Sequence, residues 1–137
     1  MKNVEIIDCP SFVDDRGWLV QIYEKTNLPE MKRMYLVSNF DEKLVRAFHK
    51  NFDETKLFYV IKGSVKFILS DDKETKTVVI SSRKPQLLVI GPEIWNGWKS
   101  LEEDTLLLGF ASTTMAEHKD ERCPPDSFKA QWETINR

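Results

Sequence analysis

Residues 57–69 read LFYVIKGSVKFIL and decide the fold class. Apolar and aromatic side chains fill both halves with the period of two that is typical of β-strands, and Gly63-Ser64 separates the halves. A Gly-Ser pair between two such runs favours a tight turn. The stretch therefore predicts two β-strands joined as a hairpin.

Further strand signals lie on both sides of this stretch. Short apolar or alternating segments, separated by turn residues, occur at 18–23, 34–38, 75–80, 87–90 and 105–111. Helical periodicity is weak and is confined to one turn at 29–33 and a short helix or extended arm at 128–135. Without internal repeats or linkers, this pattern predicts one all-β domain over residues 1–137, with a jelly roll as the best-fitting architecture.

Composition and charge limit the possible functions. The formal net charge of −2 argues against nucleic-acid binding by bulk attraction, so local arginines and lysines must hold any anionic ligand. No apolar run approaches the roughly 20 residues that cross a bilayer, and the N-terminal MKNVE lacks the apolar core of a signal peptide. We expect a cytoplasmic protein without a membrane partner, in which Cys9 and Cys123 are isolated reduced thiols.

One of the two histidines, His49, lies in the strand-like segment VRAFHKN (residues 45–51) between Arg46 and Lys50. Strand interiors seldom keep such groups without a partner or a task, because an unpaired buried charge costs several kcal/mol. A cluster of a fixed cation, a proton carrier and a second cation indicates a site that grips an anionic ligand and moves a proton.

Five motifs along the chain resemble one enzyme family. They are FVDDRGW (12–18), VRAFHKN (45–51), Lys56 with Gly63, PEIWNGW (92–98), and Asp126 with Trp132. In this order they are similar to sequence elements of the cupin-fold enzymes related to dTDP-4-dehydrorhamnose 3,5-epimerase, also called dTDP-4-keto-6-deoxyglucose epimerase. The resemblance implies a cupin-type double-stranded β-helix and a nucleotide-diphosphate sugar as the substrate.

The same resemblance implies a catalytic set of His49, Lys56 and Asp126. His49 would remove a proton beside a ketone, Lys56 would stabilise the resulting oxyanion, and Asp126 would hold the imidazole in one tautomer. From the residues alone, Lys56 is equally well a strand-end lysine that snorkels and Asp126 a solvated turn residue. The second histidine, His118, lies in a charged stretch and is expected at the solvated surface.

The resemblance also implies a set of substrate-binding residues, namely Arg16, Gln21, Arg46, Asn51 and Asn96. Guanidinium groups match phosphate oxygens, so the two arginines are candidates for the diphosphate. The alternative for Arg16 is a structural ion pair with Asp14 or Asp15.

The chain departs from the epimerase pattern at its proton donor. The family's catalytic tyrosine falls near Gly109-Phe110, and the nearest tyrosines to the expected pocket in sequence are Tyr35 and Tyr59. The related sugar 3,4-ketoisomerases also lack that tyrosine, although they carry His-x-His where this chain has His49-Lys50-Asn51. Because one histidine cannot build the usual cupin metal site, we predict no metal and no cofactor.

Three functional hypotheses follow. The first is an epimerase of a nucleotide-diphosphate 4-keto-6-deoxy sugar in surface polysaccharide biosynthesis, and the second is a 3,4-ketoisomerase of the same substrate class. The third is a sugar-nucleotide-binding cupin without catalysis. We also expect a homodimer, in which the segment 1–7 is a candidate for a strand exchanged between subunits.

Overall fold

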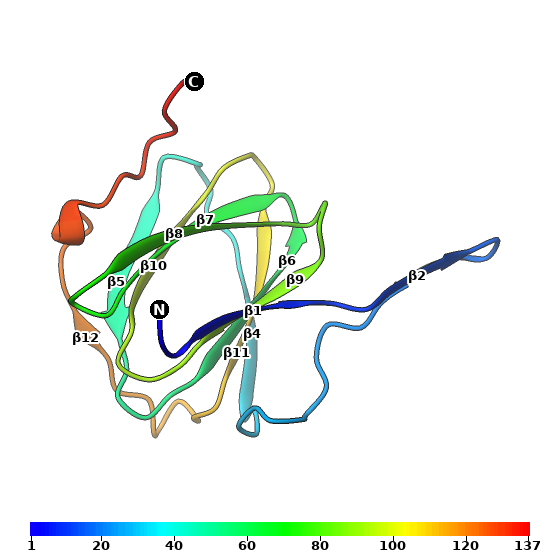
Figure 1. Ribbon diagram of the computed structural model, residues 1–137, viewed down its shortest axis with the longest axis horizontal. Coiled ribbons are helices and arrows are strands. Elements are labelled where there is room, and N and C mark those ends of the chain that lie inside the picture. The colour runs from blue at the N-terminus through cyan, green and yellow to red at the C-terminus, as the bar shows by residue number, and fades with distance from the viewer.

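The computed structural model describes residues 1–137 as two five-stranded antiparallel sheets that face each other, with a separate two-stranded hairpin (Figure 1). The elements are β1 (Val4–Asp8), β2 (Ser11–Asp14), β3 (Gly17–Val20), β4 (Arg33–Val37), β5 (Val45–Lys50), β6 (Lys56–Lys62), β7 (Ser64–Ser70), β8 (Thr75–Ser81), β9 (Gln86–Ile90), β10 (Trp95–Ser100), β11 (Leu106–Ala111), β12 (Glu121–Arg122) and the 3-10 turn η1 (Ser127–Lys129).

The first sheet has the order β1-β9-β6-β11-β4, and the second has the order β12-β5-β10-β7-β8. Strands that follow one another in the chain often lie in different sheets, as expected of a double-stranded β-helix. The predicted all-β cupin-type jelly roll is therefore confirmed. The turn expected at 29–33 is not helical, and beyond η1 the C-terminal segment is an extended arm.

The predicted hairpin at residues 57–69 is wrong in its pairing. Both strands form, but β6 pairs with β9 and β11, whereas β7 pairs with β8 and β10. Gly63 has a φ of +86°, and a Cβ there would collide with Thr105, so this glycine carries the chain from one sheet to the other. The alternation of side chains reports which faces are buried and not which strand is the neighbour.

The main core fills the space between the two sheets at one end of the jelly roll. The first sheet contributes Phe58 and Val60, and the second contributes Phe67, Leu69 and Trp98. A second apolar cluster lies on the outer face of the first sheet, under the segment 20–31. A third lies on the outer face of the second sheet, where the C-terminal arm packs against it. Polar side chains lie in the other end of the space between the sheets, which the apolar core does not fill.

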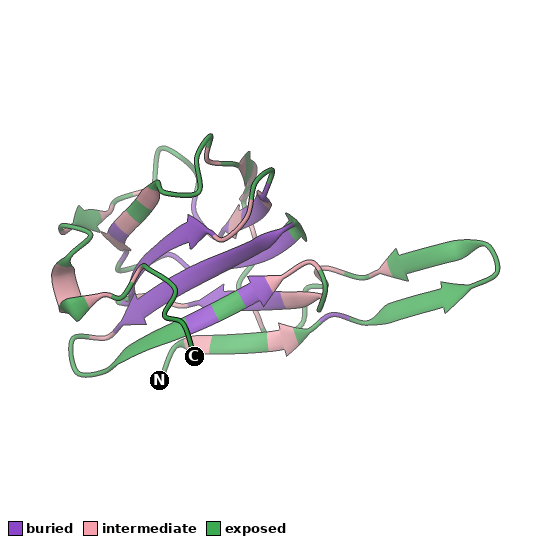
Figure 2. Ribbon diagram, turned by 90° about the horizontal axis from the view of Figure 1, so that it is seen from above, coloured by how far each residue is buried: buried purple, intermediate pink, exposed green.

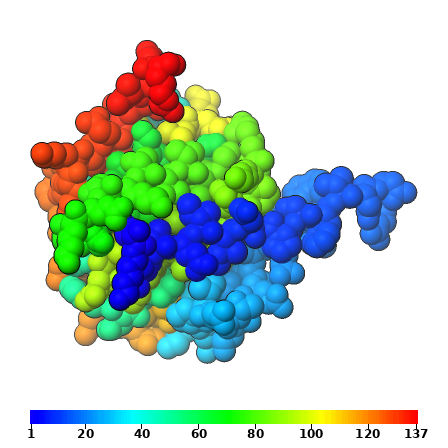
Figure 3. All heavy atoms as spheres, viewed as in Figure 1, coloured from blue at the N-terminus to red at the C-terminus, as the bar shows by residue number.

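The β2–β3 hairpin projects from the body of the protein, as the ribbon and the space-filling view show (Figures 2 and 3). Its large apolar side chains are exposed, with Val13 at 82% and Trp18 at 78% of their full accessible area. The strand expected to exchange between subunits, β1, instead pairs with β9 of its own chain. The element that extends away from the domain is thus the hairpin that follows β1.

No helix in this protein is both long enough and apolar enough to cross a membrane.

Candidate active site

A cavity of about 470 Å³ opens between the two sheets at the polar end of the jelly roll. Its lining comes from β4, β5, β6, β10 and the segment after β11: Tyr35, Val37, Val45, Arg46, Ala47, His49, Lys56, Phe58, Asn96, Trp98 and Arg122. Four residues predicted from the sequence therefore meet at one cavity, namely Arg46, His49, Lys56 and Asn96.

Strand periodicity explains why these polar groups face inward. On β6, Lys56 shares the inner face with Phe58, which belongs to the main core. On β5, His49 and Ala47 are two residues apart and both line the cavity. In a regular strand, Arg46 and His49 would point to opposite faces, because they are three residues apart. The register between β5 and β10 shifts between Asn96 and Trp98, and this irregularity brings Arg46 to the same cavity as His49.

The imidazole of His49 is held by Asp120. Its Nδ1 lies 2.8 Å from Asp120 Oδ2, and the side chains are 31% and 18% exposed. The short strand β12 pairs with β5 and places the Asp120 segment beside His49. Burial tends to raise the pKa of Asp120, but hydrogen bonds from His49 and Arg122 outweigh it, and the pKa of this carboxyl lies below its usual value.

The structure does not bring Asp126, the carboxylate implied by the resemblance, to His49. Its side chain is exposed at the start of η1 and makes no hydrogen bond to His49. The carboxylate on the imidazole is Asp120, six positions earlier in the chain. Asp126 lies away from His49 because the chain turns outward after β12 and packs its aromatic residues on the second sheet.

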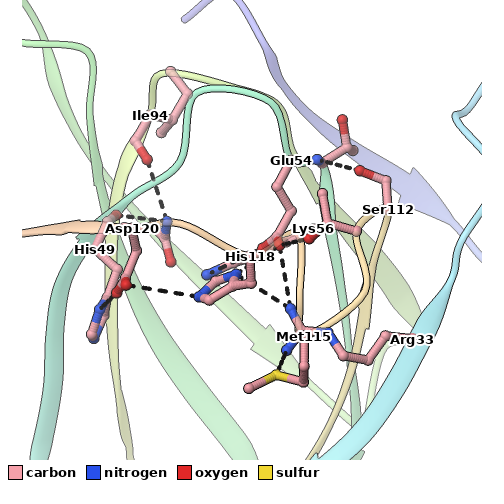
Figure 4. A network of polar contacts seen from close by, with 12 residues as sticks. Arg33, His49, Glu54, Lys56, Ile94, Ser112, Met115, His118 and Asp120 are labelled. Carbon is pink, nitrogen blue, oxygen red and sulfur yellow. Dashed lines mark hydrogen bonds and ion pairs between the residues drawn. The ribbon is translucent and has the colours of Figure 1, made fainter.

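A buried carboxylate, Glu54, lies beside this pair (Figure 4). It accepts hydrogen bonds from Arg33 at 3.2 Å, from His118 at 2.9 Å and from the hydroxyl of Thr113. The expectation that His118 is a solvated surface residue is wrong: it bridges Glu54 and Asp120, with its Nε2 3.8 Å from Asp120 Oδ1. A carboxylate with 2% of its side chain exposed requires such partners.

Lys56 is the least exposed of the cations that line the cavity. Its ammonium lies 3.8 Å from Glu54, and its side chain is 12% exposed. Burial lowers the pKa of Lys56, although the negative charges of Glu54 and Asp120 oppose this effect. An ammonium in this position is a donor suited to a substrate oxygen that gains negative charge.

Tyr35 also faces the cavity, from β4. Its strand partner on β11 is Gly109, and a Cβ built at that position would collide with the tyrosine ring and its hydroxyl. The ring therefore fills the space of the missing side chain. Burial, helped by the negative charge of Glu54, raises the pKa of Tyr35 to about 12, so its hydroxyl keeps its proton near neutral pH.

Two arginines lie at the cavity. The guanidinium of Arg46 donates to Asn39 at 2.6 Å and lies 5.8 Å from the centre of the Trp98 ring. Arg122 donates to Asp120 at 3.3 Å while 75% of its side chain remains exposed. Each guanidinium has further N–H donors, so both can bind phosphate oxygens.

The remaining predicted residues divide into two groups. Asn96 lines the cavity, but its amide donates to the backbone carbonyls of His49 and Ile94 and so ties its strand to the strand that carries His49. Asn51 is buried and is absent from the cavity wall. Arg16 and Gln21 lie outside the cavity, on the N-terminal segment.

Arg16 is 87% exposed near the tip of the β2–β3 hairpin and pairs with Asp14 at 2.5 Å. Gln21 donates to Glu24 at 3.2 Å and contributes to a different groove beside the first sheet. The pair of Arg16 with Asp14 is the structural ion pair that we gave as the alternative to diphosphate binding. Neither Arg16 nor Gln21 reaches the cavity of its own chain.

Sequence reasoning missed Asp120, Glu54, Arg122 and the placement of His118 and Tyr35. The segment 116–122 reads AEHKDER, which has the composition of a solvated surface loop. Only the local pairing of β12 with β5 reveals that it closes the cavity. The pairing of Tyr35 with Gly109 was likewise hidden, because 74 positions separate the two residues.

The structure contains no group of three or more His, Cys, Asp or Glu side chains arranged to hold a metal ion. The groups assembled at the cavity are a base with its carboxylate, a buried ammonium, a phenol and two arginines. Together these groups can bind an anion and transfer protons.

Comparisons with known proteins agree with this chemistry. Over 137 residues, 99% of this chain and 96% of the relative, the sequence is 28% identical to TDP-4-oxo-6-deoxy-alpha-D-glucose-3,4-oxoisomerase of Aneurinibacillus thermoaerophilus. It is 26% identical to the probable low-salt glycan biosynthesis epimerase Agl13 of Haloferax volcanii, covering 92% of this chain and 89% of that protein.

A solved structure is similar in both fold and sequence. It is the H51N mutant of the 3,4-ketoisomerase QdtA from Thermoanaerobacterium thermosaccharolyticum in complex with TDP-4-keto-6-deoxyglucose. The TM-score is 0.80 at 27% identity, and the match covers 90% of this chain and 89% of that one. These relatives confirm the prediction of an isomerase-class enzyme. The sequence model of one family, described as FdtA, WxcM-like, C-terminal, matches residues 2–130 of this chain, which therefore belongs to that family.

Proposed function

We propose that the protein is a 3,4-ketoisomerase of a nucleotide-diphosphate 4-keto-6-deoxy sugar. The observation that carries this proposal is the pair formed by His49 and Asp120 in the wall of a cavity that also holds Lys56 and Tyr35. The relatives from Aneurinibacillus and Thermoanaerobacterium, both named as isomerases of this type, support the choice of reaction.

The diphosphate of the substrate would lie against Arg46 and Arg122. Both guanidinium groups line the cavity, and each has only part of its donors engaged by protein atoms. Planar guanidinium forks match the paired oxygens of a phosphate. Binding here would leave the sugar deeper in the cavity, toward Lys56.

The first chemical step is removal of the proton on carbon 3 by Nε2 of His49. The electron pair of the broken C–H bond forms a double bond between carbons 3 and 4, and the carbonyl electrons move onto oxygen 4. Lys56 is placed to stabilise that oxyanion. Asp120 holds the Nδ1 proton of His49, which leaves Nε2 free as the base and stabilises the imidazolium that forms.

The second step completes the isomerisation. The imidazolium returns its proton to carbon 4, oxygen 3 loses its proton and becomes the new carbonyl oxygen, and oxygen 4 gains a proton to become a hydroxyl. Tyr35, a protonated phenol facing the cavity, is the group we assign to move the proton between the two oxygens. One base on one face of the sugar suffices for this sequence.

A second candidate is an epimerase of the same substrate class. Tyr35 and His49 reach the cavity from strands of different sheets. Epimerisation needs such an arrangement, because one group takes a proton from one face of a carbon and another group returns a proton to the opposite face. The Haloferax relative, named as a probable epimerase of glycan biosynthesis, supports this alternative. In either case the product would serve the assembly of a deoxysugar-containing glycan.

Incubation with dTDP-4-keto-6-deoxyglucose in heavy water tests the proposal. A 3-keto product identified by NMR supports the ketoisomerase. A 4-keto product that has inverted carbon 3 or has gained deuterium at carbon 5 supports the epimerase. Recovery of unchanged substrate, with other nucleotide-linked 4-keto sugars also unchanged, contradicts both.

We also propose that the protein works as a homodimer through the β2–β3 hairpin. Phe12, Val13, Trp18 and Leu19 are all exposed on this two-stranded projection. An isolated hairpin is marginally stable in water, and four exposed large apolar side chains on it favour burial against a second copy. Such docking would also give Arg16 a route to a cavity, namely that of the partner.

A further inference from the structure

His118 is bound by carboxylates from two sides (Figure 4). Its Nδ1 lies 2.9 Å from Glu54 Oε2, and its Nε2 lies 3.8 Å from Asp120 Oδ1. Nδ1 contacts Glu54 at 2.9 Å and the Arg33 guanidinium at 3.4 Å; because the shorter contact is to a carboxylate, which only accepts, we assign a proton to Nδ1, which donates a hydrogen bond to Glu54. The imidazole thus lies between Glu54, to which it is hydrogen-bonded, and Asp120, which lies at ion-pair distance and is the carboxylate that holds His49.

Glu54 is a fixed anchor for this imidazole. Its side chain is 2% exposed, and it is held by Arg33 at 3.2 Å and by the hydroxyl of Thr113. The next residue, Thr55, donates its backbone N–H to the hydroxyl of Ser112 at 2.8 Å. A buried carboxylate with several such bonds cannot move without leaving charges unpaired.

The backbone of His118 is fixed as well. Its N–H donates to the carbonyl of Thr114 at 3.0 Å, and the neighbouring Glu117 accepts a hydrogen bond from the N–H of Thr114 at 3.1 Å. Lys32, just before β4, pairs with Glu117 at 3.2 Å. The segment that carries His118 is therefore attached to the edge of the first sheet.

Asp120 is shared between two histidines. Its Oδ2 binds His49 at 2.8 Å and Arg122 at 3.3 Å, whereas His118 faces its other oxygen. Without His118, every ring or guanidinium partner of Asp120 would lie on one oxygen, and the carboxylate could rotate away from the geometry that orients the base. A polar cluster kept at such a desolvation cost beside a cavity indicates a functional role.

We propose that His118 is a positioning residue that holds Asp120 through its second carboxylate oxygen and so ties the His49 base to the Glu54–Lys56 pair. The kinetic part of this inference rests on the proposed function. Charged groups that face His118 are Glu54 from the loop before β6, Arg33 from β4 and Asp120 from its own segment. Of these, only Asp120 transmits the position of His118 to His49.

Two substitutions separate the two nitrogens of the ring. In His118→Asn the amide nitrogen takes the place of Nδ1 and keeps the bond to Glu54, but nothing reaches Asp120. In His118→Gln the amide nitrogen takes the place of Nε2 and keeps the contact with Asp120. We expect His118→Asn to lower kcat by about tenfold to a hundredfold with KM little changed, as when the partner that orients an imidazole is lost. His118→Gln should recover most of this loss.

NMR provides a readout that needs no substrate, because the chain has only two histidines. In His118→Asn the remaining imidazole N–H signal belongs to His49, and we expect its low-field resonance to shift or broaden relative to wild type and to return in His118→Gln. An unchanged His49 resonance in the folded His118→Asn protein overturns the proposal, as does equal loss in both variants together with a lower Tm. If turnover fails with every sugar but the resonance responds, the proposed function fails and the positioning role stands.

Discussion

Tyr35 on β4 lies directly across from Gly109 on β11, and its ring occupies the space that a side chain at position 109 would fill. The epimerase resemblance implied a catalytic tyrosine near position 109. Here the neighbouring strand supplies a phenol to the same place, and burial keeps that phenol protonated. The pair therefore gives a structural reason for a small residue at 109 and a candidate for the proton donor.

Tyr35→Phe should remove that donor without disturbing the fold. Phenylalanine keeps the ring that packs against Gly109 and loses only the hydroxyl. We expect kcat to fall by about a hundredfold to ten-thousandfold, the usual contribution of a positioned acid or base, and Tm to stay near that of wild type. Gly109→Ala, which displaces the ring, should lower activity as well. Wild-type turnover by Tyr35→Phe would remove the tyrosine from the mechanism.

The carboxylate assigned to His49 can be tested against the one implied by resemblance. Asp120→Asn should lower kcat by about tenfold to ten-thousandfold, because the amide no longer stabilises the imidazolium that forms on proton transfer. Asp126→Asn is the matched control, since the Asp126 side chain is exposed and apart from His49, and it should turn over like wild type. The reverse order of effects in steady-state kinetics would show that the structural assignment is wrong.

Asp120 should also make the free energy of unfolding depend on pH. Its pKa is lower in the folded protein than the ordinary value of 3.8, so its ionised form stabilises the fold above that pH. This contribution disappears as pH falls from about 3.8 through the folded pKa. The difference in unfolding free energy between wild type and Asp120→Asn, measured by urea unfolding, should therefore be larger near pH 6 than near pH 3. A difference that does not change with pH would contradict the ion pair.

The exposed hairpin predicts a dimer that depends on its apolar side chains. Trp18→Ser combined with Leu19→Ser should convert a dimer to a monomer in light scattering after gel filtration. Val79→Ser is the control, because Val79 is also an exposed apolar strand residue, 51% accessible, but lies on β8 of the main domain. A wild-type protein that elutes as a monomer would refute the interface.

Arg16 offers a sharper test of the same interface. If it serves the cavity of the partner, inactive Arg16→Ala and His49→Asn proteins should regain activity when their subunits are mixed and exchanged. The mixed dimer then combines an intact His49 in one subunit with Arg16 of the other. No recovery on mixing, or full activity of Arg16→Ala alone, would show that Arg16 has no such role.

How much the sequence predicts depends on the range of the interaction. Charges inside a strand-like segment located His49 and Arg46, because a polar residue in an apolar strand is a local signal, whereas Lys56 was assigned through the family resemblance. The strand pattern also gave the fold class. It did not give the partners of β6 and β7, since alternation is the same whichever strand lies alongside.

The remaining site residues were hidden for a different reason. Asp120 and His118 lie in a charged segment whose composition is that of a solvated loop, and only the pairing of β12 with β5 turns it inward. Glu54 precedes β6 in a polar loop, and its carboxylate can be buried because Arg33 on another strand pairs with it. These contacts join positions far apart in the chain, so no local pattern reports them.

The central claim is that His49 breaks the C–H bond at carbon 3 of a nucleotide-linked 4-keto sugar. The direct measurement is the fate of deuterium in dTDP-4-keto-6-deoxyglucose labelled at carbon 3, followed by NMR with wild type and with His49→Asn. We predict that wild type releases the label from carbon 3, to carbon 4 or to solvent, and that His49→Asn leaves it in place. Product formed by wild type with the label still on carbon 3, or label lost equally fast with His49→Asn, would contradict the account.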